Sequence, residues 1–151
     1  MFLLYKPIGF GKKENVLKPS DNEVKEFFKL LDSHKLSCKV GFDSCSCPGM
    51  INFSNTIDMR FVDYCEGGRF SCYIDANMNM MPCSFCNQDE KYYVDLHNTT
   101  IQKAWYSDVF EDFRNKLKQS CPKCKHRGEC GGGCPVSRDI VLCGRKEKEF
   151  A

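Results

Sequence analysis

The feature that most constrains this chain is a run of cysteines near its carboxyl end. Four of them fall within fourteen residues of the sequence: Cys121, Cys124, Cys130 and Cys134. The gap of two residues between the first pair lets both sulfur atoms reach one metal centre, and the glycines at 131–133 let the backbone turn back beside it. This spacing predicts a tetrahedral thiolate site, suited either to zinc or to an iron–sulfur cluster.

Composition favours a globular protein that keeps its thiols reduced. The 151 residues include twelve cysteines, and 28% of the residues are charged. The apolar start is too short for a secretory signal, and no apolar run reaches the length that spans a membrane. We therefore expect a cytoplasmic protein, where such cysteines bind metal more often than they form disulfides. A formal net charge of +2 gives no indication of a nucleic-acid partner.

The first sixty residues have the pattern of a strand, a helix and a second strand. Continuous apolar character predicts a strand at 2–5, and a second strand is expected at 36–42. Ser20 with Glu23 forms the capping box of the helix between them. This βαβ order implies a parallel, right-handed crossover. One such unit leaves its strand edges uncovered, so either another chain completes the sheet or, as we expect, the unit is part of a longer protein.

Residues 43–49 are expected to be a loop at the end of the second strand. Functional groups of α/β folds gather at that edge of the sheet. Two interpretations of Cys45 and Cys47 stay open here: both are unliganded thiols of a connector, or one of them is an additional cluster ligand. The role of Cys38 is equally open.

The pattern changes to that of a β-hairpin after residue 60. Alternation at 70–75, a turn and a return through Pro82 predict two antiparallel strands, with a further short strand at 92–94. Helices are expected to begin at Thr99 or Thr100 and at Asp108. The hairpin distributes four more cysteines along the chain: Cys65, Cys72, Cys83 and Cys86. The predicted fold class is therefore α+β, and Cys72 could equally be a small buried core residue.

The cysteine pattern resembles a known family. The tight run at 121–134, followed by Cys143, matches the end of the seven-cysteine motif of the SPASM domain. That domain follows the catalytic barrel in a group of radical S-adenosylmethionine (radical SAM) enzymes. Cys65 and Cys83 fit the first half of the motif, with Met78 where a glycine is usual. The resemblance covers residues 61–143 and implies a hairpin and helices wrapped around two auxiliary 4Fe–4S clusters.

Carried over position by position, the resemblance implies two ligand sets. Cluster I takes Cys65, Cys83 and Cys134, with Cys72 as the first choice for the fourth ligand and Cys86 as the second. Cluster II takes Cys121, Cys124, Cys130 and Cys143. Neighbouring cysteines of the tight run would thus serve different clusters, which ties the hairpin to the carboxyl-terminal segment.

The departures from the family limit what the chain is expected to do alone. Radical SAM enzymes bind S-adenosylmethionine through a Cys-x3-Cys-x2-Cys cluster, and this sequence has no such triplet. Residues 1–60 would then be the carboxyl-terminal remnant of a partial (β/α) barrel and 61–151 the SPASM domain. No catalytic or S-adenosylmethionine-binding residue is identified, so that cofactor belongs only to a complete enzyme. Ser84 replaces the aspartate base of the sulfatase-maturing branch, which favours a peptide- or protein-modifying maturase.

The resemblance also implies a role and partners. The clusters would serve electron transfer and substrate positioning. The partners would be a peptide or protein substrate, an electron donor such as a ferredoxin or flavodoxin, and the missing amino-terminal part of the barrel. Two other classes remain open: a structural zinc module of four cysteines with no redox role, and a secreted disulfide-rich binding protein.

Overall fold

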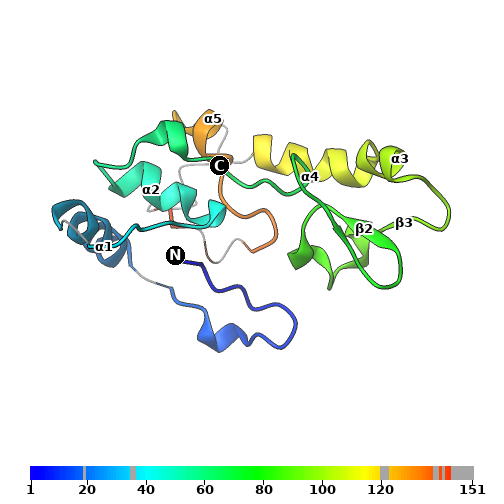
Figure 1. The fold of residues 1–151 in the computed structure, drawn as a ribbon, viewed down its shortest axis with the longest axis horizontal. Coiled ribbons are helices and arrows are strands. Elements are labelled where there is room, and N and C mark those ends of the chain that lie inside the picture. The colour runs from blue at the N-terminus through cyan, green and yellow to red at the C-terminus, as the bar shows by residue number, and fades with distance from the viewer. Residues whose placement is uncertain (19, 35–36, 120–122, 138–139, 141, 144–151) are drawn as a thin grey trace.

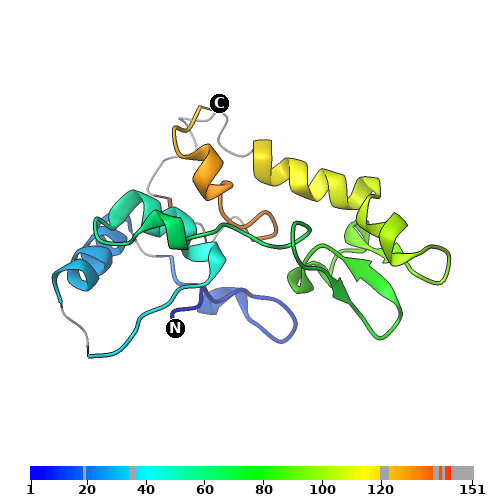
Figure 2. The ribbon, with the colours of Figure 1, turned by 45° about the horizontal axis from the view of Figure 1, so that its top comes forward.

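The computed structural model describes residues 1–18, 20–34, 37–119, 123–137, 140 and 142–143. Helices α1 (Asp21–Ser33) and α2 (Cys47–Phe53) lie at one end of the molecule (Figures 1 and 2). A small sheet lies at the other end with α3 (Ile101–Trp105) and α4 (Asp108–Gln119), and α5 (Arg127–Cys130) lies between the two ends. Short 3-10 turns occupy Lys13–Asn15, Ser44–Ser46, Met59–Phe61, Ser84–Cys86 and Glu90–Tyr92. No helix in these ranges is long and apolar enough to cross a lipid bilayer.

Helix α1 begins where the sequence predicts. The Ser20 hydroxyl accepts the Glu23 backbone N–H at 3.4 Å, and the Ser20 N–H donates to the Glu23 carboxylate at 2.7 Å, which is a complete capping box. On the inner face of the helix Phe28 is fully buried. Its ring lies 5.6 Å from that of Phe42 and 6.5 Å from that of Phe53, so the helix is held by an aromatic cluster.

The two strands predicted at 2–5 and 36–42 are shorter than expected. Within the described residues they reduce to one parallel bridge between Phe2 and Phe42, with residues 35 and 36 lying outside the description. The next N–H of a parallel ladder belongs to Leu4, and it donates at 3.1 Å to the side-chain carboxylate of Asp43 rather than to a backbone carbonyl. The ladder therefore ends after one bridge, and the barrel fragment stays a prediction.

The expectation of a loop at 43–49 is wrong. The Asp43 carboxylate accepts the Ser46 N–H at 3.0 Å and caps a 3-10 turn over Ser44–Ser46, which leads directly into α2. Pro48 lies in the first turn of α2, where its missing N–H costs nothing. Cys47 at the start of this helix is fully buried against α1.

The predicted hairpin is confirmed in a shorter form. Strands β1 (Tyr73–Ile74), β2 (Asn79–Met81) and β3 (Val94–Asp95) form an antiparallel sheet in that order. Because β1 begins at residue 73, Cys72 lies just before the strand and not within it. The strand expected at 92–94 begins later, since Glu90–Tyr92 form a 3-10 turn.

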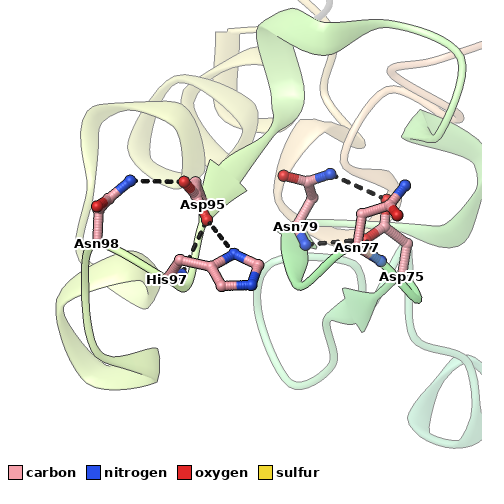
Figure 3. Close-up of polar contacts among 6 residues, drawn as sticks. All are labelled: Asp75, Asn77, Asn79, Asp95, His97 and Asn98. Carbon is pink, nitrogen blue, oxygen red and sulfur yellow. Dashed lines mark hydrogen bonds and ion pairs between the residues drawn. The ribbon is translucent and has the colours of Figure 1, made fainter.

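Two aspartates close the turns at the edge of this sheet (Figure 3). The Asp75 carboxylate accepts the backbone N–H groups of Asn77 at 2.9 Å and Asn79 at 2.8 Å. The Asp95 carboxylate accepts the N–H of His97 at 2.8 Å in the same way. In each turn the carboxylate accepts backbone N–H groups for which the short strands provide no carbonyl acceptor.

The core of this end is built on the middle strand. Met80 packs against Ala104 and Phe110, and Met81 packs against Tyr92 and Phe113, so both methionines are fully buried beneath α3 and α4. The two helices begin close to their predicted starts, at Ile101 behind the Thr100 cap and at Asp108. The helices thus fix the segment that leads from β2 into Cys83.

The hairpin turn contains a strained backbone position at Met78. Its φ is +61°, and Asn77 beside it does not adopt the left-handed region. The SPASM motif usually has glycine at this position. Here methionine occupies the hairpin position whose positive φ favours glycine. A left-handed backbone costs an L-residue about 1–2 kcal/mol, partly offset by the greater chain entropy that a glycine loses on folding.

We predict that Met78→Gly raises the free energy of unfolding by roughly 0.5–1 kcal/mol, because glycine adopts this φ without strain. Urea denaturation followed by circular dichroism measures the change. Asn77→Gly is the matched control, and it should lower stability or leave it unchanged. A lower stability for Met78→Gly than for the wild type would contradict this explanation.

Candidate functional site

A cavity of about 500 Å³ lies between the amino-terminal segment and the hairpin, and several cysteines are among its lining residues. Five of them surround it: Cys45, Cys65, Cys72, Cys83 and Cys134. None of these five is in a disulfide. The sequence-predicted set of cluster I (Cys65, Cys72, Cys83 and Cys134) therefore lines one cavity, and Cys45 lines it too.

Cys65 is held in place by its neighbours in the chain. The Arg69 guanidinium donates to the Cys65 carbonyl at 3.2 Å and stacks on the Tyr64 ring at 3.9 Å. A side chain at Gly67 would lie 3.0 Å from the Pro82 carbonyl oxygen and 3.3 Å from the Cys83 Cβ atom. Because Gly67 has no Cβ, the chain segments that carry Cys65 and Cys83 can approach closely.

The two cysteines of the pair Cys83-x2-Cys86 lie in different surroundings. Cys83 lines the cavity, whereas Cys86 is buried in the core beside Met81 and Tyr92. The hydrogen bond from Cys86 holds the pKa of Cys83 below its ordinary value. Cys86 thus stabilises a thiolate at Cys83 from its position in the core.

Cys134 and Cys45 form a second hydrogen-bonded pair. The hydrogen bond from Cys45 is the main cause that lowers the pKa of Cys134, and it raises the pKa of Cys45. The Ser137 backbone N–H also points to the Cys134 sulfur, at 3.3 Å. Donors to a sulfur atom favour its thiolate form, which is the form that binds metal.

Lys6 brings a positive charge into the same cavity. Its side chain is 6% exposed, and its Nζ atom lies 3.5 Å from the Asp43 carboxylate and 4.5 Å from the centre of the Phe85 ring. Burial acts to lower the pKa of Lys6, but the charges of Cys45 and Asp43 outweigh it and raise that pKa. A buried ammonium beside several thiols makes the cavity suited to a group with negative charge.

The predicted cluster II set is described only in part. Cys121 lies outside the described residues. Cys124 precedes the short helix α5 and Cys130 is its last residue, and the Cys124 sulfur accepts the His126 N–H at 3.4 Å. Cys143 is half-buried. A shared site for these four residues stays a prediction.

Cys47 lies close to this second group. Its thiol donates to the Glu129 carbonyl at 3.6 Å, and burial, followed by the charge of Cys130, raises its pKa to about 12. The turn Cys45-Ser46-Cys47 thus places one thiol at the cavity and the other beside α5. In the part of the chain that is described, no three His, Cys, Asp or Glu side chains are gathered tightly enough to hold a single metal ion.

The glycines at 131–133 turn the backbone between Cys130 and Cys134, as predicted. Their φ angles are +60°, +80° and +81°, all in the region that favours glycine. A Cβ atom on Gly131 would lie 2.3 Å from the Tyr64 ring. This close contact places the carboxyl-terminal turn against the segment of Cys65.

The comparison with known proteins agrees with this chemistry. Residues 65–130 match the family model of an iron–sulfur cluster-binding domain. That family is SPASM, so this part of the chain is a SPASM domain. The match begins at Cys65, the first cavity cysteine in that domain. No curated protein and no solved structure matches the chain.

The donor set of the cavity fits an iron–sulfur cluster. Such clusters are held by cysteine thiolates, and the cavity has more thiols than the four that one cluster needs. Cys45 and Lys6 lie outside the family match. For Cys45 the position at the end of a predicted strand was a usable signal, whereas nothing in the local sequence points to Lys6 or Asp43.

We predict that Gly131→Ala destabilises the protein by about 2 kcal/mol or more, because the new methyl group meets the Tyr64 ring at a positive φ. The matched control is Gly128→Ala, whose Cβ meets nothing within 4 Å. That change lies in α5 and should be neutral or stabilising by up to about 1 kcal/mol. Thermal unfolding of both variants measures the difference, and equal effects would contradict the close packing.

Proposed function

We propose that the chain binds auxiliary 4Fe–4S clusters as the carboxyl-terminal part of a radical SAM enzyme that modifies a peptide or protein. One observation carries the proposal: Cys65, Cys83 and Cys134 line one cavity although they are far apart in the sequence. These are the three residues that the SPASM resemblance assigns to a single cluster. The match at 65–130 supports the same chemistry.

The thiolates of Cys65, Cys83 and Cys134 would hold cluster I, and Cys121, Cys124, Cys130 and Cys143 would hold cluster II. A bound cluster supplies one-electron transfer. Around cluster I, Lys6 would balance negative charge, and the Ser137 N–H and the Cys86 thiol would stabilise the coordinating sulfur atoms of Cys134 and Cys83. Phe113 forms part of the cavity wall and is 1% exposed, so it excludes water from that side.

The exposed side of the cavity suits a larger partner. Cys72 and Tyr73 are exposed where the cavity meets the surface. A peptide or protein substrate held there would lie beside the cluster, and an electron donor such as a ferredoxin or flavodoxin would approach the domain from outside. The parallel bridge between Phe2 and Phe42 with α1 between them supports a barrel-derived amino-terminal segment. S-adenosylmethionine would bind only in the complete enzyme.

We predict that anaerobically purified or reconstituted protein contains about eight irons and as much sulfide per chain. Iron and acid-labile sulfide assays, together with visible absorption, measure this. Zinc without sulfide would contradict the proposal and favour a structural zinc module. Iron and sulfide at about four per chain would mean that the protein binds one cluster and not two.

We predict that Lys6→Met shifts the reduction potential of cluster I to more negative values, on the order of tens of millivolts. Reduction adds negative charge, and the variant removes a buried cation that stabilises it. Spectroscopic redox titration measures the potential. Lys6→Arg keeps the charge, and Lys12→Met removes an exposed one; neither control should reproduce the shift. An unchanged potential in Lys6→Met would contradict this role.

A further inference from the structure

We propose that Cys45 is the fourth thiolate ligand of the cluster in the cavity, in place of Cys72 or Cys86. This inference rests on the proposed function and identifies the one ligand that the family resemblance leaves variable. Cys45 lies outside the SPASM match at 65–130, so the ligand would come from the amino-terminal part of the chain.

Position favours Cys45 over Cys72. Both line the cavity, but Cys45 is buried whereas Cys72 is exposed. The Cys45 thiol is within hydrogen-bonding reach of Cys134, and the two residues pack together with Ile140 in one buried group. Cys45 is therefore buried and already lies beside Cys134, one of the three proposed ligands.

Cys86 is a poorer candidate because it does not line the cavity. It is 1% exposed and packs in the core with Met81, Tyr92 and Phe113. Its thiol serves the Cys83 sulfur as a hydrogen-bond donor. To become a ligand, Cys86 would have to leave the core and give up this bond.

The turn that carries Cys45 is rigidly supported. The Asp43 carboxylate accepts the Ser46 N–H at 3.0 Å and the Ser46 hydroxyl at 2.6 Å, so it fixes the backbone on both sides of Cys45. The same carboxylate accepts the Leu4 N–H and pairs with Lys6. A ligand held by such a shell is positioned before the metal binds.

A cation that can compensate a Cys45 thiolate lies close to it. A fourth thiolate adds one negative charge to the cavity, and a buried anion needs a nearby cation. Lys6 supplies it, because its ammonium is buried and lies close to Cys45 as well as to Asp43. With Cys45 as a ligand, the cluster would attach the amino-terminal segment directly to the SPASM domain.

The test compares Cys45→Ala and Cys72→Ala after anaerobic reconstitution. Losing the fourth thiolate leaves one iron without a cysteine, so mild ferricyanide oxidation should release it and give the electron paramagnetic resonance signal of a three-iron cluster. We expect that signal, at least fivefold above wild type, in Cys45→Ala and not in Cys72→Ala. Cys47→Ala is the control from the same turn, buried but not lining the cavity, and it should behave as wild type in this assay.

The opposite result overturns the inference: a three-iron signal in Cys72→Ala or Cys86→Ala with none in Cys45→Ala. A wild-type signal as strong as that of Cys45→Ala also overturns it, as does an equal signal in Cys47→Ala. All these outcomes leave the proposed function standing, because the wild type still binds iron and sulfide. Wild-type protein that binds neither would instead reject the proposed function itself.

A measurement on the wild type covers the case in which Cys45→Ala does not fold. Amide hydrogen exchange is compared between cluster-loaded and chelator-stripped protein. We expect loading to slow exchange in residues 43–47 at least tenfold. Residues 101–105 of α3, which do not line the cavity, serve as the internal control. Equal exchange at 43–47 in the two forms would overturn the inference.

Discussion

One carboxylate joins the first residues of the chain to the turn that carries Cys45. Asp43 accepts the Leu4 N–H, pairs with Lys6 and caps the turn that carries Cys45. It does so where a parallel ladder would otherwise continue, so a side chain replaces the next backbone partner. The position of both Lys6 and Cys45 at the cavity follows from this substitution.

Charged groups that line the cavity have partners that offset the free-energy cost of their burial. An ammonium or a thiolate taken out of water costs several kcal/mol unless an opposite charge or hydrogen-bond donors compensate. Here each kind of charge has partners at hand: Asp43 for Lys6, Cys86 for Cys83, and the Ser137 N–H for Cys134. Lys6, the Cys86 thiol and the Ser137 N–H would compensate a bound anionic cluster, which is why the domain match and the cavity chemistry support one another.

The sequence predicted the parts of the fold that depend on local signals. The capping box of Ser20 and the hairpin before Cys83 are read from neighbouring residues, and both are present. The turn and helix after Asp43 were missed, because seven residues of helix hardly display a period. The meeting of Cys45 with Cys134 could not be predicted from spacing, since it joins two residues that lie far apart in the sequence.

The left-handed turn at Met78 bears on how related chains can be recognised. The hairpin requires a backbone dihedral at this position, and glycine is the easiest residue to supply it. Here a methionine adopts the same angle while Asp75 accepts the neighbouring N–H groups and secures the turn. A search pattern that demands glycine would reject this chain, whereas one built on the turn geometry and the flanking cysteines would find it.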